Sequence, residues 1–381
     1  MDLRFYLRHF DYLLLAVVSA LTAYGVAMIY FATRHDIADR PLHYAGYQIV
    51  YGVVGLAGLF ALSMVDYERY RRWQWPLYFA VVGSIAAVFL LGSAIRGSRR
   101  WIETPFFNLQ PSELGLVILT VALAAFLTDR LQLMGMWRVT LGVLAYVGLP
   151  ALLVFLQPDL GTTLVFAVLV VTALIFYGTP WTHFVAVVGA AAGFVLLIVK
   201  VLPAVGVHVI KGYQMDRLLV FIHPGHDPQG VGYNVTQSII AVGSGALTGR
   251  GDLATQTTLD FLPEHHTDFI FAVVGERYGF AGGALLLGLF VFLIWRALRI
   301  ATLSADLYGS IIAGSVAAMF LFEVFVNVGM TVGIMPVTGI PLPFVSYGGA
   351  ALITNLMMVG ILESIHLRRT MRRSGGVDAL R

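Results

Sequence analysis

The fold is decided by an apolar run near the start of the chain, Asp11 to Ala32, with the sequence DYLLLAVVSALTAYGVAMIYFA. A helix needs about 20 such residues to cross the hydrocarbon core of a bilayer. Comparable runs recur at 44–65, 76–95, 111–128, 139–156, 160–178, 183–202, 268–298, 307–333 and 347–366. Because these runs are continuous and do not alternate, they predict helices and argue against a β-barrel. We therefore expect an all-α, polytopic membrane protein with about ten transmembrane helices.

The amino-acid composition indicates the same class. The 381 residues are 59% hydrophobic and only 12% charged, which leaves too little polar surface for a soluble globule. The first run is too long for the apolar region of a cleaved signal peptide, so it is expected to be the first span. No internal repeat or linker is visible, and we expect one integral membrane domain over residues 1–381. The absence of cysteine excludes disulfides and thiolate chemistry, and a net charge of +3 gives no indication of nucleic-acid binding.

The arginines predict which side of the membrane each loop faces. Clusters at 69–72 and 368–373 lie on a short loop and a tail, where the positive-inside rule acts most strongly. Both termini, including a tail of about 367–381, are therefore expected in the cytoplasm. Residues 203–267 then form one long extracytoplasmic loop, whose amphipathic pieces predict interfacial helices. These pieces are 214–222 and 234–242.

The motif Pro263 to Phe271, PEHHTDFIF, ends the long loop and begins the next span. Asp268 is its last carboxylate before a further apolar stretch. An ionisable group at such a boundary is costly to desolvate and its pKa is easily shifted, which is typical of groups that transfer protons. Asp268 is therefore the candidate catalytic residue.

Two further acidic residues, Glu113 and Asp159, stand at the starts of spans. Each carboxylate either caps its helix, where the macrodipole favours negative charge, or lines a polar cavity. A basic and aromatic group precedes Glu113 and consists of Arg96, Arg99, Arg100 and Trp101. Such residues are commonly interfacial anchors, but the planar arginine side chain also suits phosphate binding. The sequence leaves both pairs of alternatives open.

The adjacent residues His265 and His266, beside Glu264, raise the question of a metal site. Neighbouring histidines point in different directions on regular backbone and match no common zinc spacing, so no dedicated zinc site is expected. A loosely bound Mg²⁺ or Mn²⁺ shared with substrate phosphate is favoured instead, because such ions need only one or two carboxylates.

Polar and helix-breaking residues also occur at membrane depth. Glu323 and Asn327 are expected to face the bundle interior, either at the site or in structural hydrogen bonds. The glycines and prolines at 339–349 predict an interrupted helix where backbone lines a cavity. For Gly348 and Gly349, close packing of helices is an equal alternative.

Five motifs, in this order, resemble the SEDS family of membrane proteins and, within it, the RodA-like branch. They are Arg100-Trp101, Gln110 to Glu113, Gln157 to Thr162, Pro263 to Phe271 and Gly333 to Gly349. The resemblance covers about residues 11–373. It implies a peptidoglycan glycosyltransferase with ten transmembrane helices that joins lipid II units on the outer face of the cytoplasmic membrane during cell elongation.

The resemblance also implies roles for single residues. Asp268 matches the essential aspartate of the family, and Glu113 and Trp101 match a required glutamate and tryptophan. Many relatives have lysine where this chain has Leu116, so a cation expected in the cavity is missing or supplied elsewhere. Further contacts with the substrate are expected from Asp159, Glu264, His266, Thr267 and Ser346.

The chemistry of lipid II sets what these residues must do. A sugar hydroxyl is a poor nucleophile at neutral pH, so Asp268 is expected to act as general base, which is typically worth about 10² to 10⁴ in rate. An α-linked donor and a β-linked glycan predict a single inverting displacement. The departing lipid pyrophosphate needs fixed positive charge. The candidates are Arg100, Lys211, Arg217 and Arg277.

Two other functions stay open. A lipid II transporter, or flippase, needs polar groups along its whole path, yet the cytoplasmic halves of the spans are nearly bare of charge. A non-catalytic scaffold of the cell-wall synthesis complex would leave Asp268 dispensable. The implied partners are a class B penicillin-binding protein and other membrane proteins of the elongation complex. The chain has no Ser-x-x-Lys motif with which to crosslink strands itself.

Overall fold

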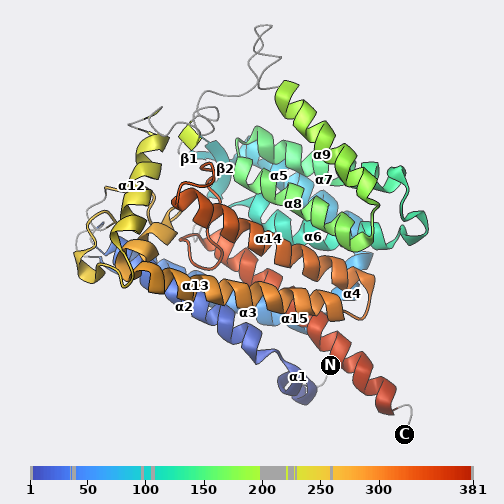
Figure 1. Ribbon diagram of the computed structural model, residues 1–381. Coiled ribbons are helices and arrows are strands. Elements are labelled where there is room, and N and C mark those ends of the chain that lie inside the picture. The colour runs from blue at the N-terminus through green and yellow to red at the C-terminus, as the bar shows by residue number, and fades with distance from the viewer. Residues whose placement is uncertain are drawn as a thin grey trace.

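The computed structural model describes residues 3–34, 36, 40–95, 98–103, 108–197, 220–221, 227, 230–257 and 261–378. They form a bundle of long helices, with a small sheet and one crosswise helix at one end (Figure 1). Of the predicted amphipathic piece 214–222, only residues 220 and 221 are described.

The predicted spans are helices in the structure. Within the described part of the chain, nine helices are long and apolar enough to cross a membrane. They are α2 (Tyr12–Thr33), α3 (His43–Met64), α5 (Gln74–Leu91), α6 (Pro111–Thr128), α7 (Trp137–Leu156), α8 (Leu160–Tyr177), α13 (Ile270–Leu303), α14 (Leu307–Thr331) and α15 (Gly349–Asp378). The span predicted at 183–202 corresponds to α9 (Trp181–Leu196), which has 16 residues. The all-α, polytopic prediction is confirmed.

Helix α6 occupies the centre of the bundle. Its apolar window is 89% buried, whereas those of α3 and α5 are 28% buried. It contacts α5, α7, α8, α14 and α15. A helix covered on so many sides has little contact with lipid, so the first turn of α6 is presented to protein neighbours.

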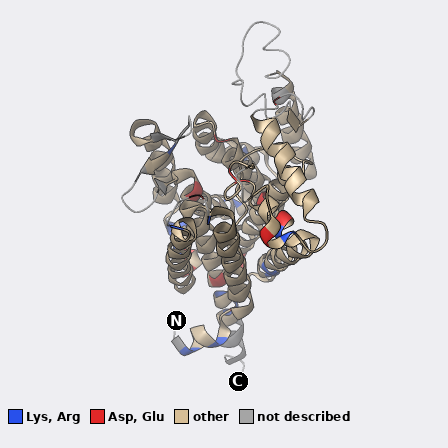
Figure 2. Ribbon diagram, turned by 90° about the vertical axis from the view of Figure 1, so that its left-hand side faces the viewer, with Lys and Arg blue, Asp and Glu red and all other residues tan. Residues whose placement is uncertain are grey.

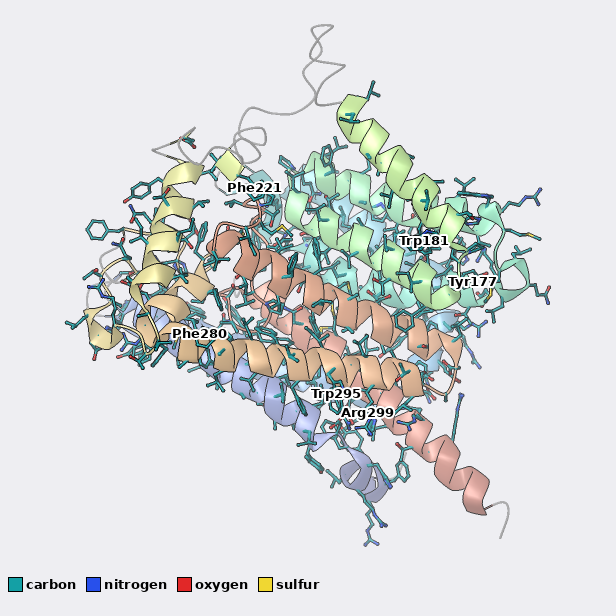
Figure 3. The ribbon with its side chains drawn as sticks, viewed as in Figure 1. Tyr177, Trp181, Phe221, Phe280, Trp295 and Arg299 are labelled. Atoms are coloured by element: carbon teal, nitrogen blue, oxygen red, sulfur yellow. The ribbon has the colours of Figure 1, made fainter. Side chains whose placement is uncertain are left out.

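The outer helices present apolar side chains to the surroundings, as a lipid-facing surface requires. Trp181, Phe280 and Trp295 lie on the outside of the bundle (Figure 3), with exposed fractions of 77%, 70% and 48%. Acidic and basic residues are sparse along the helices (Figure 2). The guanidinium carbon of Arg299 lies 5.4 Å from the ring of Trp295, a pairing typical of the membrane interface.

Both chain ends lie at the same end of the bundle, far from the crosswise helix α12 (Val231–Ser244) (Figure 1). Helices α1 (Leu3–His9) and α4 (Tyr67–Arg72), the latter rich in arginine, both contact α15 there. Helix α15 continues unbroken past residue 366, so the segment predicted as a tail begins as an extension of the last span.

Helix α13 is broken at Gly279, where φ is 61° and ψ is −155°. Only glycine adopts this conformation readily. The segment after α12 fills the break, because Phe280 N–H donates to the Ala246 oxygen at 2.8 Å and Ala281 N–H donates to the Leu247 oxygen at 3.0 Å.

Helix α12 contains the predicted amphipathic piece 234–242 and lies across the ends of α13 and α14 (Figure 1). Its Ser238 hydroxyl donates to the Thr331 oxygen at 2.8 Å. The prediction of a helix here is confirmed, whereas its position at a membrane surface stays a prediction.

A small antiparallel sheet joins α5 to α6 and was not anticipated from sequence. Its strands are β1 (Ser93–Ile95), β2 (Ser98–Glu103) and β3 (Asn108–Leu109), in that spatial order. Strand β2 contacts α5 and α6, and β3 contacts α15. The sheet therefore brings Arg100 and Trp101 to the start of α6.

Candidate functional site

Asp268 lies in a turn, residues 263–269, immediately before α13. Three consecutive backbone oxygens of this turn accept hydrogen bonds from residues of α14 and of the connection that follows it. The bonds are Tyr347 N–H to the His266 oxygen at 2.9 Å, Ser346 Oγ to the Thr267 oxygen at 2.6 Å, and Asn327 Nδ2 to the Asp268 oxygen at 2.9 Å. The position of the Asp268 backbone is therefore set by distant parts of the chain.

The connection between α14 and α15 is held by buried polar side chains. Asn327, fully buried on α14, also donates through Nδ2 to the Ile340 oxygen at 2.8 Å. Gln48 of α3 donates to the Ser346 oxygen at 3.0 Å and accepts from Gly348 N–H at 3.2 Å. The interrupted backbone predicted at 339–349 is thus present, and buried side chains satisfy these backbone groups.

Glu264 and Thr267 close the turn. Glu264 has a φ of 56°, a strained conformation for a residue with a side chain, and such strain is common at functional sites. Thr267 Oγ1 donates to the Glu264 carboxylate at 2.9 Å, and Phe269 N–H donates to the Glu264 backbone oxygen at 3.2 Å. Both residues thus shape the turn, and their contact with substrate stays a prediction.

A cluster of aromatic rings, here called the aromatic wall, includes two residues of the Asp268 turn. Its members are Tyr44, His265, His266 and Tyr347. The His266 ring is half-buried, and its centroid lies 5.1 Å from that of Tyr44 and 5.8 Å from that of Tyr347. His265 packs edge to face against His266, with centroids 5.3 Å apart. Tyr44 belongs to α3, so the wall connects the Asp268 turn to another span.

Asp159 caps α8, as the simpler of its two sequence readings proposes. Its carboxylate accepts from Thr162 N–H at 3.2 Å, Thr162 Oγ1 at 3.0 Å and Gln110 Nε2 at 3.0 Å. Arg100 lies 3.6 Å from the same carboxylate and donates to the backbone oxygens of the two preceding residues. Arg100 and Asp159 therefore tie β2 to the α7–α8 connection, and a contact of either with substrate stays a prediction.

Glu113 differs from Asp159 in its surroundings. It lies half-buried in the first turn of α6, and among the described residues its carboxylate accepts no hydrogen bond. It interacts electrostatically with Asp159 and with Glu323, an inward-facing residue of α14. Leu116, one turn further along α6, is 2% exposed and adds no positive charge. The acidic group of Glu113, Asp159 and Glu323 thus receives no positive charge from α6, and Arg100 of β2 is the cation that lies beside it.

The remaining predicted residues do not gather at one point. Trp101 is half-buried on β2. Arg277 binds Asp252 at 2.6 Å and lies over the Phe31 ring at 3.7 Å, so its guanidinium group is already engaged. The predicted pyrophosphate ligands Lys211 and Arg217 lie outside the described residues.

Glu276 was missed by the sequence reasoning. It is fully buried in α13, and its carboxylate accepts from Thr255, Gln256 and Thr257 N–H at 2.8–3.0 Å and from Thr257 Oγ1 at 2.8 Å. It thereby fastens the segment 251–257 to the helix that begins after Asp268. The available signal was a carboxylate inside an apolar run, the same signal that singled out Glu323.

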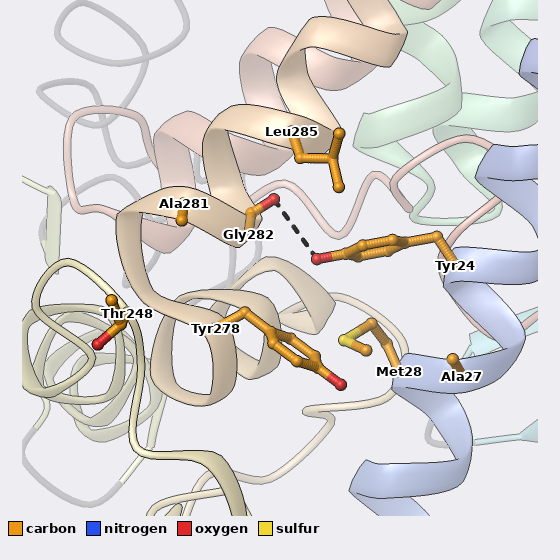
Figure 4. A pocket seen from close by; sticks show the side chains of 8 residues that line it. All are labelled: Tyr24, Ala27, Met28, Thr248, Tyr278, Ala281, Gly282 and Leu285. Carbon is orange, nitrogen blue, oxygen red and sulfur yellow. Dashed lines mark hydrogen bonds between the residues drawn. The ribbon is translucent and has the colours of Figure 1, made fainter.

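An apolar cavity of about 470 Å³ lies between α2 and α13 (Figure 4). Tyr24 crosses it and donates to the Gly282 oxygen at 3.4 Å. Its lining residues are Tyr24, Ala27, Met28, Thr248, Tyr278, Ala281, Gly282 and Leu285. None of the predicted site residues lines this cavity.

Known proteins resemble this chain over nearly its whole length. The family model of the FtsW, RodA and SpoVE cell cycle proteins matches residues 11–371. Peptidoglycan glycosyltransferase MrdB of Escherichia coli is 36% identical over 366 residues, which are 95% of each chain. A probable peptidoglycan glycosyltransferase FtsW of Trichlorobacter lovleyi is 34% identical over 387 residues, which are 98% of each chain.

Solved structures agree with these matches. RodA of Thermus thermophilus superposes with a TM-score of 0.68 at 29% identity, covering 94% of this chain and 97% of its own. A chain of a peptidoglycan synthase complex described as coordinating polymerization and crosslinking superposes with a TM-score of 0.78 at 29% identity, covering 94% and 98%. By sequence and by fold, then, the chain belongs to the FtsW/RodA/SpoVE family, the SEDS proteins.

Proposed function

We propose that this protein is a peptidoglycan glycosyltransferase that polymerises lipid II into glycan strands. The observation that carries the proposal is the fixed position of Asp268, whose turn is hydrogen-bonded by Asn327, Ser346 and Tyr347. The names of the E. coli and T. lovleyi relatives support the same activity.

In the proposed reaction, Asp268 acts as general base. Its carboxylate takes the proton of the acceptor sugar hydroxyl while that oxygen bonds to the anomeric carbon of the donor. The bond from this carbon to undecaprenyl pyrophosphate breaks, so the anomeric configuration inverts in one displacement. A base must hold its position against the substrate, and a half-buried carboxylate on a pinned turn suits this requirement.

The leaving pyrophosphate gains negative charge and needs a cation. A loosely held Mg²⁺ or Mn²⁺ is part of the proposal, and Glu113 fits such an ion because its half-buried carboxylate accepts no hydrogen bond within the described residues. The ion would neutralise phosphate oxygens. The proposed protein contacts of the pyrophosphate are Arg100, Lys211 and Arg217. The aromatic side chains proposed to line the substrate site are Trp101 and His266.

We place Asp268 on the outer side of the cytoplasmic membrane and both termini in the cytoplasm. The arginine-rich helix α4 and both termini lie together at one end of the bundle, which supports this orientation by the positive-inside rule. The proposed partner is a class B penicillin-binding protein, which the resemblance to a chain of a synthase complex supports. A role in elongation is proposed on the RodA-like 333–349 motif.

The test is polymerisation of labelled lipid II by the purified full-length protein, alone and with a penicillin-binding partner. Asp268→Asn keeps size and most hydrogen-bonding capacity but cannot take a proton, so glycan synthesis should fall by at least about 10². Asp252→Asn is the matched control: an aspartate on an outer segment whose side chain is 76% exposed, and it should retain activity.

Each rival function predicts a different result, and transport is measured with the same protein in lipid vesicles. A transporter would move labelled lipid II across vesicle membranes and make no glycan. A scaffold would do neither, and Asp268→Asn would leave cell-wall synthesis intact. Glycan made equally by wild type and Asp268→Asn would refute Asp268 as the base.

A further inference from the structure

Asp36, His265 and His266 form a polar cluster beside the Asp268 turn. One ligand atom of each side chain lies within 4.8 Å of the others. Asp36 comes from the segment after α2, whereas the histidines come from the turn before α13. We propose that these side chains bind a divalent transition-metal ion of the zinc class.

The backbone explains why adjacent histidines can share a ligand here. On a regular helix or strand their rings would diverge, which is why the sequence argued against a zinc site. The turn is not regular, since Glu264 has a φ of 56° and residues 263–269 form consecutive turns. The rings of His265 and His266 consequently lie with centroids 5.3 Å apart at 75°.

His265 also has the hydrogen bond that a metal-binding imidazole usually makes. It is 2% exposed, and its Nδ1 lies 2.8 Å from the Leu262 oxygen. A carbonyl oxygen only accepts, so this bond places the proton on Nδ1 and leaves the lone pair on Nε2. A histidine that ligates metal through one nitrogen typically donates from the other to a carbonyl in this way.

The second ring nitrogen of His265, Nε2, also faces a backbone oxygen, which favours a positively charged group at Nε2. Nε2 of His265 lies 3.2 Å from the Ala32 oxygen, a second acceptor. In a neutral ring with the proton on Nδ1, the Nε2 lone pair would face that oxygen. A second proton on Nε2 would donate to that oxygen, whereas a metal ion on Nε2 would lie close enough to the Ala32 oxygen to take it as a further ligand. The nearby Asp36 carboxylate and the His266 ring favour a metal ion, because they supply further ligands.

The ligand set indicates the class of ion. Two imidazoles and one carboxylate, with positions left for water or substrate, are typical of catalytic zinc sites and unsuited to Mg²⁺, which prefers oxygen. Ligand atoms on zinc lie about 2.0–2.2 Å from the metal, so small side-chain rotations must close the cluster. The side chain of Asp36 is exposed, so tight packing does not oppose such a rotation.

The test measures metal binding without substrate, so it does not depend on the proposed polymerisation. Full-length protein in nanodiscs, with affinity tags removed, is stripped with chelator and titrated calorimetrically with Zn²⁺, Mn²⁺ and Mg²⁺. We expect one Zn²⁺ per chain, with weaker Mn²⁺ binding and no Mg²⁺ binding at this site. His265→Gln and Asp36→Asn should weaken Zn²⁺ binding at least about tenfold. His9→Gln, on α1 at the opposite end, should not.

X-ray absorption on the Zn²⁺-loaded wild type provides a readout that needs no variant. We expect nitrogen and oxygen atoms in the first coordination shell of the zinc ion, and scattering from the more distant ring atoms of two imidazoles. Failure of the wild type to bind stoichiometric Zn²⁺ would overturn the site and leave the cluster as an ion pair between Asp36 and a protonated histidine. Binding unchanged in both well-folded variants, or a shell without imidazole, would overturn it equally.

Discussion

Asn327 Nδ2 lies 2.9 Å from the backbone oxygen of Asp268 and 2.8 Å from that of Ile340. One buried amide in the last third of α14 therefore joins the Asp268 turn to the α14–α15 connection. Neither acceptor is close to Asn327 along the chain, so both contacts exist only in the folded bundle.

Replacing Asn327 with leucine should lower glycan synthesis without touching the reacting atoms. The change keeps the number of side-chain heavy atoms but removes the donor from the buried Ile340 carbonyl and from the partly buried Asp268 carbonyl. A buried carbonyl left without its donor costs about 1–3 kcal/mol. We expect kcat to fall by more than tenfold with little change in KM, together with a lower Tm. Ser315→Ala on the same helix is the control, since this fully buried hydroxyl makes no hydrogen bond within the described structure. Equal kcat in the Asn327→Leu variant would contradict a positioning role.

Glu276 should be required for the order of the segment 251–257. Glu276→Ala removes the acceptor of three backbone N–H groups and one hydroxyl, and hydrogen bonds to a charged group are worth about 1.5–3 kcal/mol each. We expect a loss of at least about 3 kcal/mol in stability, with new protease cleavage near Thr255. Thermal melts and limited proteolysis followed by mass spectrometry measure both. An unchanged cleavage pattern would show that other contacts hold the segment.

Gly279→Ala should disrupt the break in α13. A Cβ atom there would lie 2.5 Å from Gly249 N and 2.6 Å from the Gly245 oxygen, and the positive φ adds strain. We expect a loss of more than about 2 kcal/mol and lower yields of folded protein. Gly288→Ala in the same helix has open space around its Cβ and should gain up to about 1 kcal/mol through helix propensity. Similar melting temperatures for the two variants would refute the requirement for glycine at 279.

Asp252 gives a prediction for pH. Its hydrogen bond from Arg277, together with the Arg277 charge, holds the pKa of the Asp252 carboxyl below its ordinary value of 3.8. A lowered pKa means that the ion pair stabilises the fold above that ordinary value and is lost as pH falls through the folded value. The Tm difference between wild type and Asp252→Asn should thus be constant from about pH 5 to 8, and it should shrink as the pH falls from 3.8 through the lowered pKa of the folded protein. A difference that widens on acidification would contradict this sign.

The spans were predictable from sequence because their signals are local, and the choice of Asp268 as the candidate base, which stays a prediction, rests on a local signal too. The length of an apolar run such as Asp11 to Ala32 is enough to predict a membrane span. Asp268 is easily recognised because it is a carboxylate beside a run of the same kind. The cap formed by Asp159 was one of two interpretations, and its hydrogen bond from Thr162 N–H confirms the cap, whereas its place in a cavity stays a prediction.

The supports of the site were not predictable, because they join residues far apart in the sequence. The sequence around Gln48 does not indicate a hydrogen bond to Ser346, and the sequence around Asn327 does not indicate one to Asp268. The strands at 93–109 escaped notice because they are short and lie between spans. The prediction against a zinc site assumed regular backbone at His265 and His266, whereas residues 263–269 form turns; whether a metal binds there stays untested.

The bonds from Asn327, Ser346 and Tyr347 to successive carbonyls have a mechanical consequence. The turn that carries Asp268 has little independent motion, because the residues that bond it belong to α14 and to the α14–α15 connection. A displacement of α14 would therefore be transmitted to the backbone of residues 266–268, so forces on this helix within the bilayer are coupled to the position of the Asp268 turn.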